Sequence, residues 1–347
     1  MRPTSIITLL ASGVLALALP QATGGSPAGV EAMRHFATVG SGNTYSYLLS
    51  KPDGKPKGTV FLLHGFPDLS YGWRYQMPTL TQLGYQVVAP DMLGYGRTSA
   101  PKDVGAYTYK KMTDDLAALA KQIAPGEQII LGGHDWGAAM VYRTALWHPE
   151  LVKGLITVTT PYSPPAAQYT DVADMVKAGL TNFGYQVAMR DPAIEAKLQT
   201  KDQIRQMLLA MYGAQTPQGQ PGFTAEKGLL FDNFASLGSS PLLSTTDLEY
   251  YVNEYVNSTV AAPLHWYRTA KLNWQDEQSL VAAGGKIKVP TLFITATQDT
   301  ALPASLSVGM ENYFDKLTRG TVDSSHWALW QGAKNVTTQI ATFIASF

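Results

Sequence analysis

An aspartate lies at the centre of the glycine-flanked stretch Gly133-His134-Asp135-Trp136-Gly137. The apolar run before it indicates a buried strand, and the small apolar residues from Ala138 to Leu146 indicate a helix packed on the same sheet. The flanking glycines allow strand and helix to approach closely, so that Asp135 stands strained and exposed on the turn. A carboxylate there can attack an electrophilic sp3 carbon and form an alkyl ester that water then hydrolyses. Epoxides and alkyl halides are electrophiles of this kind.

Two further polar groups follow strands later in the chain. Asp299 comes after the strand expected at 289–295, and His326 comes after the strand expected at 320–322. Because ligands bind at the carboxyl ends of the strands in an open α/β sheet, these side chains are expected to meet Asp135. His326 would activate water against the ester, and Asp299 would orient it and stabilise its protonated form. The stretch 158–162 offers no carboxylate, which favours Asp299 as the acid.

Negative charge that develops on the ester oxygen needs backbone N–H donors. The residue after the nucleophile, Trp136, would supply one of them. Phe66 would supply the second, because it stands in the loop His64-Gly65-Phe66-Pro67 that follows the apolar strand expected at 59–63. Pro67 lacks an N–H and can only shape this loop.

The elements that must position these residues alternate along the first half of the chain. Segments 35–39 and 45–49 flank Gly40–Asn43 and predict a hairpin. Further strands are expected at 59–63, 85–89, 128–131 and 154–158, and helices at 73–83 and 107–123. Strands that alternate with helices predict a mostly parallel, doubly wound α/β sheet.

From about Pro161 to Lys286 the strand-like runs disappear. Helical segments are expected at 193–212 and 247–256, between loops rich in Pro and Gly. We interpret residues 162–286 as a helical cap inserted after the sixth strand, and residues 30–161 with 287–347 as the core. The sheet resumes at 289–295, and 336–347 is expected to be the closing helix.

Composition excludes several classes of function. The chain has 347 residues, with 26 basic against 26 acidic side chains, so nothing indicates a nucleic-acid partner. There is no cysteine, which excludes disulfides, thiolate metal sites and cysteine nucleophiles. The six histidines show no metal-ligand spacing, and no glycine-rich phosphate or dinucleotide loop is present. We therefore expect neither a metal nor an organic cofactor.

The amino terminus has the pattern of a secretory signal. Arg2 precedes the apolar run from Ile6 to Leu19, and helix-breaking and small residues follow from Pro20. This predicts a cleavable signal peptide at 1–22 and a secreted mature protein without a stable membrane span. The apolar run is short for a span. An uncleaved amino-terminal membrane anchor is the alternative.

In combination these motifs resemble the α/β-hydrolase-fold epoxide hydrolases of the soluble type, from about residue 34 to the end of the chain. The resemblance implies an eight-stranded α/β-hydrolase sheet with a cap, and a small-molecule epoxide as substrate. It also implies two cap tyrosines that donate a proton to the epoxide oxygen. Tyr267 matches one within Pro263–Arg268, and Tyr185, followed by Gln186, is similar to the other. Ser325 departs from the glycine that relatives often carry at that position.

The expected reaction converts an epoxide and water to a vicinal diol through an ester on Asp135. A haloalkane dehalogenase is one alternative, since such enzymes resemble this chain in the Asp nucleophile and the Trp after it. Their usual halide-holding Asn is replaced here by Phe66, and the two tyrosines would have no purpose. A non-catalytic ligand-binding protein of the same fold is another alternative. It would not need Asp135, His326 and Asp299 to be intact together.

Overall fold

One sheet of eight strands organises the molecule, in the order β1-β2-β4-β3-β5-β6-β9-β10. β1 pairs antiparallel with β2 and β2 with β4, whereas all other neighbours in this sheet are parallel. This computed structural model describes residues 25–347, and the predicted signal segment 1–22 lies outside them. The predicted fold class, a mostly parallel α/β sheet with flanking helices, is confirmed. The strands are β1 (Arg34–Thr38), β2 (Thr44–Ser50), β3 (Thr59–Leu63), β4 (Gln86–Pro90), β5 (Ile129–His134), β6 (Val152–Val158), β9 (Thr291–Ala296) and β10 (Leu317–Val322).

The register of the parallel strands brings their carboxyl ends to one edge of the sheet. Leu63 at the end of β3 pairs with Gly133 of β5, His134 pairs with Val158 of β6, and Ala296 of β9 pairs with Val322 of β10. Every residue of β3 and β5 is buried, as expected for parallel strands covered by helices on both faces. Whatever follows these strands must therefore meet at the same edge.

Helices cover the sheet in two packed pairs, α3 with α4 and α2 with α14. α3 buries Met112, Leu116 and Leu119 on one face, and its first turn is capped by the Thr108 side chain. The continuous helix predicted at 73–83 is wrong in its extent: a 3-10 turn precedes α2, which starts only at Met77. Pro78 has no N–H to continue a helix from earlier residues, but it fits a first turn. The bounds are α1 (Pro27–Glu31), α2 (Met77–Gln82), α3 (Tyr109–Ile123), α4 (Trp136–Trp147), α13 (Ala328–Gln331) and α14 (Ala333–Ile344).

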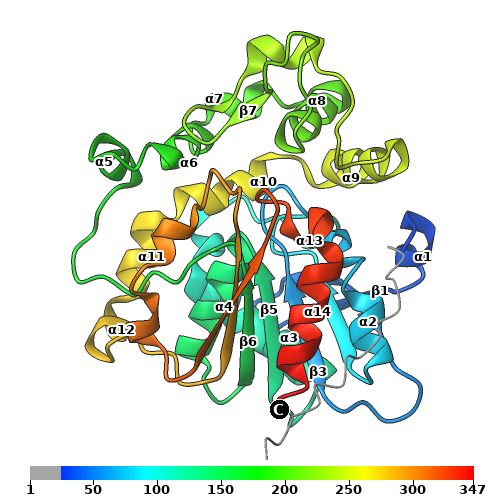
Figure 1. Cartoon of the computed structure of the whole chain (residues 1–347), viewed down its shortest axis with the longest axis vertical. Helices are drawn as coiled ribbons and strands as arrows, with labels where there is room; N and C mark the ends of the chain where they lie inside the picture. The colour runs from blue at the N-terminus through cyan, green and yellow to red at the C-terminus, as the bar shows by residue number, and fades with distance from the viewer. Residues whose placement is uncertain (1–24) are drawn as a thin grey trace, which may run out of the picture.

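The insertion, defined here as the chain between β6 and β9, is mainly helical. Figure 1 shows α5 to α9 above the edge of the sheet, while α11 and α12 lie lower, beside the helices of the sheet. The division into a core and a cap at 162–286 stays a prediction. The helices are α5 (Val172–Lys177), α6 (Gly184–Met189), α7 (Ala193–Ala196), α8 (Lys201–Met211), α9 (Thr245–Ser258), α10 (Ala261–Leu264), α11 (Ala270–Asp276) and α12 (Gln278–Ala282).

Two expectations for the insertion are corrected. The helix predicted at 193–212 is broken into α7, which ends at Ala196, and α8, which Thr200 opens with a capping box to Gln203. The expected absence of strands is also wrong, since β7 (Phe223–Thr224) and β8 (Gly228–Leu229) form a short antiparallel hairpin. Gly228 has φ +76, a conformation suited to such a tight turn.

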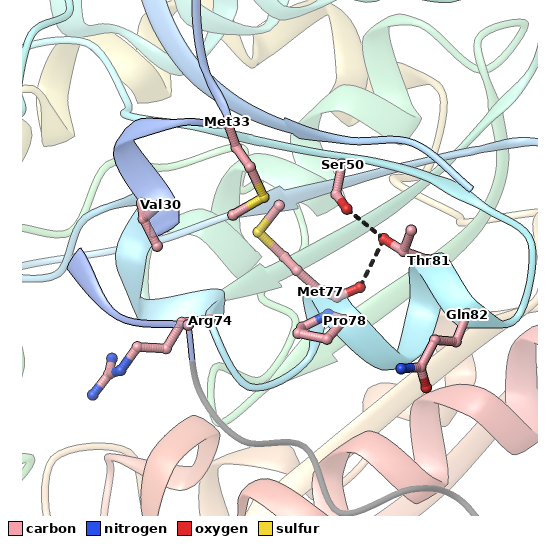
Figure 2. A pocket seen from close by; sticks show the side chains of 9 residues that line it. Val30, Met33, Ser50, Arg74, Met77, Pro78, Thr81 and Gln82 are labelled. Atoms are coloured by element: carbon pink, nitrogen blue, oxygen red, sulfur yellow. Dashed lines mark hydrogen bonds between the residues drawn. The ribbon is translucent and has the colours of Figure 1, made fainter. Parts of the chain in front are cut away.

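A pocket of about 260 Å³ lies between α1, β2 and α2, apart from the strand ends. Figure 2 shows the thioethers of Met33 and Met77 facing each other across it, while the guanidinium of Arg74 points away. Its lining includes none of the residues predicted to do chemistry. Within residues 25–347, no helix combines the length and the apolar character needed to cross a bilayer.

Candidate active site

The turn between β5 and α4 holds Asp135 in a strained conformation. Its φ is +54°, which a residue with a side chain rarely adopts. A Cβ on Gly133 would lie 2.4 Å from the carbonyl oxygen of Gly137, and a Cβ on Gly137 would lie 2.2 Å from that of Leu63. Only glycines allow this approach, so the close strand-to-helix turn predicted from the sequence is present. The strain is of the kind that collects at functional sites.

A second strained residue adjoins the first. Thr159, directly after β6, has φ +68°. The next residue, Thr160, donates its hydroxyl to the carbonyl oxygen of Asp135 at 2.9 Å. The main chain of the turn is therefore held from the neighbouring strand as well as by its own helix.

His326 and Asp299 meet Asp135 as predicted. The Nδ1 atom of His326 lies 2.7 Å from Oδ2 of Asp299, and its Nε2 atom lies 3.5 Å from Oδ2 of Asp135. The other oxygen of Asp299 accepts the N–H groups of Ala301 and Leu302, both at 2.9 Å. Asp299 is therefore fixed and can orient the imidazole, whose other nitrogen faces Asp135.

The charges of this triad stabilise one another. Burial lowers the pKa of His326, but the carboxylates of Asp299 and Asp135 outweigh burial and raise the pKa to about 10. Burial raises the pKa of Asp135, but His326 outweighs it and holds that pKa below its ordinary value. The same balance between burial and His326 lowers the pKa of Asp299. At neutral pH the free site holds an imidazolium between two carboxylates.

Backbone N–H groups face the carboxylate of Asp135. The N–H of Phe66 donates to Oδ1 at 2.8 Å. The backbone N–H of Trp136 also lowers the pKa of Asp135, after the larger effects of burial and His326. Both groups predicted for the oxyanion hole are thus near the same carboxylate. Oδ1 is held by the loop after β3, and Oδ2 faces His326.

The insertion brings both predicted tyrosines to the site. Tyr185 is the second residue of α6, Tyr267 lies in the 3-10 turn after α10, and their ring centroids are 6.2 Å apart. The ring of Tyr267 packs edge-on against Phe66 and Trp136, at 5.6 and 5.2 Å. Burial and the charge of Asp135 raise the pKa of both phenols, so both stay protonated at neutral pH.

Sequence reasoning missed a buried acid beside this site. Asp68 follows Pro67, is 1% exposed, and accepts the hydroxyl of Tyr251 at 2.6 Å on Oδ1. Its Oδ2 has no hydrogen-bond partner among residues 25–347. Burial raises the pKa of Asp68 to about 7, against the hydrogen bonds from Tyr251 and the N–H of Leu69. The sequence feature that could have indicated Asp68 is its position in the loop after β3, two residues after Phe66.

The part of the chain that the structure describes contains no set of ligands for a metal ion. No group of three or more His, Asp or Glu side chains there could hold a metal ion.

The chain is similar to known proteins over most of its length. The family model of the alpha/beta hydrolase fold matches residues 58–333. Over 327 residues the chain is 38% identical to epoxide hydrolase srdG of Neurospora crassa. This alignment covers 90% of this chain and 95% of that protein. It is 33% identical over 255 residues to epoxide hydrolase A of Mycobacterium tuberculosis, covering 72% of this chain and 78% of that protein.

A solved structure extends the likeness to three dimensions. The crystal structure of epoxide hydrolase A from Mycobacterium thermoresistibile matches with a TM-score of 0.76 and 28% identity, over 90% of this chain and 98% of that one. The family model covers most of the chain, and the Neurospora crassa relative is matched almost from end to end. This protein therefore belongs to the α/β-hydrolase family, and within it to the epoxide hydrolases.

Proposed function

We propose that this protein hydrolyses epoxides to vicinal diols, with Asp135 as the nucleophile. One observation carries the proposal: a carboxylate on a strained turn is met by a His–Asp pair and by two protonated tyrosines from the insertion. The tyrosines decide between reaction classes. A leaving halide needs hydrogen-bond donors but no proton, whereas an opening epoxide ring develops an alkoxide that must be protonated.

In the first step Oδ2 of Asp135 attacks an epoxide carbon, because Oδ1 is already engaged by the N–H of Phe66. A carbon–oxygen bond of the ring breaks, and the alkoxide takes a proton from Tyr185 or Tyr267. His326 can then return a proton to the phenolate through solvent. The products of this step are an alkyl ester on Asp135, a neutral His326 and two intact phenols.

The second step follows from the change in charge. Esterification removes the negative charge of Asp135, which is one of the influences that raise the pKa of His326. The neutral imidazole can now accept a proton from water, and the resulting hydroxide attacks the ester carbonyl carbon. The oxyanion forms on Oδ1, next to the N–H of Phe66. Collapse releases the diol and restores the Asp135 carboxylate with a protonated His326.

The reaction class is tested with purified protein and a mixed panel of terminal, internal and aryl epoxides beside bromoalkanes. Diol formation and halide release are followed together, and Asp135→Ala is the control. Diol without halide, lost in the variant, is the expected result. Halide without diol would replace the proposal by dehalogenation. Ligand-dependent thermal protection without either product would support a binding protein.

The base is tested by trapping the ester. His326→Gln should still be alkylated by an epoxide but should stall there, because no imidazole accepts the proton of water. Intact-mass analysis should show a protein that is heavier by the mass of one epoxide. Absence of this adduct in the variant, although the wild-type protein turns the same epoxide over, would remove His326 from the second step.

We further propose that the protein is secreted after removal of residues 1–22. The support is the sequence alone, with Arg2 before the apolar run Ile6–Leu19. Expression of the full chain should yield a protein in the medium whose amino terminus lies near residue 23. Full-length protein retained in the membrane pellet would favour the amino-terminal anchor.

A further inference from the structure

His134 is a buried histidine that the reaction as proposed does not use. It is the last residue of β5, directly before Asp135, and only 1% of it is exposed. Its ring lies against the catalytic histidine, with 4.8 Å between the ring centroids of His134 and His326. The two residues are 192 positions apart in the chain.

The contact that His134 makes is with main chain. Its Nε2 atom lies 2.8 Å from the carbonyl oxygen of His326. A carbonyl can only accept, so the hydrogen of this neutral imidazole must be on Nε2. The same oxygen accepts the N–H of Ala328 at 2.9 Å. Both lone pairs are therefore occupied, and the backbone of His326 is tied to the strand that carries the nucleophile.

The charge state of His134 suits a fixed support. Its Nδ1 atom has no hydrogen-bond partner among the described residues. Burial and the neighbouring His326 lower the pKa of His134 to about 4, although Asp135 and Asp299 act in the opposite direction. His134 therefore stays neutral across the range in which His326 changes charge, and the hydrogen bond to the carbonyl persists in both halves of the reaction.

We propose that His134 is a positioning residue whose Nε2–H holds the main chain of His326, and so keeps the imidazole in place to activate water against the ester. This inference rests on the proposed function. The geometry also indicates that this support matters for the step in which His326 activates water. Nε2 of His326 lies 3.5 Å from Oδ2 of Asp135, longer than an ordinary hydrogen bond, so the ion pair with Asp135 fixes this edge of the ring only loosely. Its other edge is held by Asp299, at 2.7 Å from Nδ1.

Two substitutions separate positioning from packing. The amide nitrogen of Gln stands at the position of Nε2, whereas the amide of Asn reaches only the position of Nδ1. His134→Asn should slow hydrolysis of the ester about tenfold or more, because a small displacement of a catalytic group is costly, while alkylation changes much less. His134→Gln should restore hydrolysis. Single-turnover kinetics, with the trapped ester quantified by intact mass, measure the two steps separately.

A readout without turnover distinguishes this proposal from the proposed function. The proton between Nδ1 of His326 and Asp299 is followed by NMR in the unreacted protein. It should shift or broaden in His134→Asn and stay unchanged in His134→Gln. An unchanged resonance in the Asn variant, or equal losses of hydrolysis in both variants, overturns the role of His134. Failure of the wild-type protein to form any ester would overturn the proposed function instead. If the Asn variant does not fold, slow ester hydrolysis in a folded Gln variant overturns the inference.

Discussion

The charge on His326 depends on the charge on Asp135, and this coupling can be measured. The carboxylates of Asp299 and Asp135 raise the pKa of His326 to about 10 against the effect of burial. Asp135→Asn mimics the neutral ester, so the pKa of His326 should fall towards the ordinary histidine value. An NMR titration of the His326 ring in both proteins measures this. The same pKa in the variant would show that Asp299 alone holds the proton, and the proposed switch between the two steps would fail.

Asp68 should make the stability of the protein depend on pH. Burial raises its pKa in the folded protein to about 7, well above the value of about 3.9 expected for an unfolded chain. As pH rises, Asp68 therefore loses its proton at a lower pH in the unfolded state than in the folded state. The free energy of unfolding should decrease as pH rises from about 4 to 7. Asp68→Asn should therefore be more stable than wild type at pH 8, by roughly 2 kcal/mol or more, with a smaller difference at pH 5. Urea denaturation at both pH values measures it, and parallel curves for the two proteins would contradict it.

At the scale of elements, the approach of α4 to the sheet is set by Gly137. A Cβ on this residue would lie 2.2 Å from the carbonyl oxygen of Leu63, in β3, so backbone would have to move. Gly137→Ala should cost about 3 kcal/mol or more, or prevent folding. Gly40→Ala, where a Cβ meets nothing within 4 Å, is the control and should be nearly neutral. A melting temperature of the Gly137 variant equal to that of the control would show that strand and helix can separate freely.

At the scale of the whole molecule, Arg143 joins both ends of the insertion to α4. Its Nε and Nη2 atoms lie 2.7 and 3.1 Å from the carboxylate of Glu277, and its Nη1 donates to the carbonyl of Ser163 at 2.9 Å. The side chains of Arg143 and Glu277 are 10% and 8% exposed. The helix that begins beside Asp135 therefore also holds the segment that carries Tyr185 and Tyr267.

Loss of one partner of this buried pair should be severe. Arg143→Met should cost about 3–5 kcal/mol of stability, because Glu277 is left buried and unpaired. Arg143→Met combined with Glu277→Met should recover part of that loss, as measured by urea denaturation in a double-mutant cycle. Arg205→Met is the matched control: its partners Asp202 and Glu249 are more exposed, so about 0–1 kcal/mol is expected. Equal losses of stability in the Arg143 and Arg205 variants would show that the buried pair of Arg143 and Glu277 contributes no more than an exposed pair.

The sheet and the polar groups at its edge could be predicted from the order of the residues. Asp135, Asp299 and His326 each follow a parallel strand. Parallel strands run in the same direction, so their carboxyl ends lie at one edge of the sheet. The glycines around Asp135 and the place of Phe66 after β3 were likewise readable, because local chain geometry requires them. Element ends were less predictable: Pro78 in the first turn of α2 and the cap Thr200 before α8 mark new helix starts within segments whose apolar periodicity was continuous.

The contacts between distant segments could not be predicted in this way, because they depend on how the elements pack. The hydrogen bond from His134 to the carbonyl of His326, the clamp of Arg143 on Glu277 and the burial of Asp68 leave no local pattern in the sequence. Each depends on how closely two elements approach after packing, and on which polar atoms lose water when they do. The pKa values follow from that burial, so the charges of the site are properties of the fold rather than of its residue types.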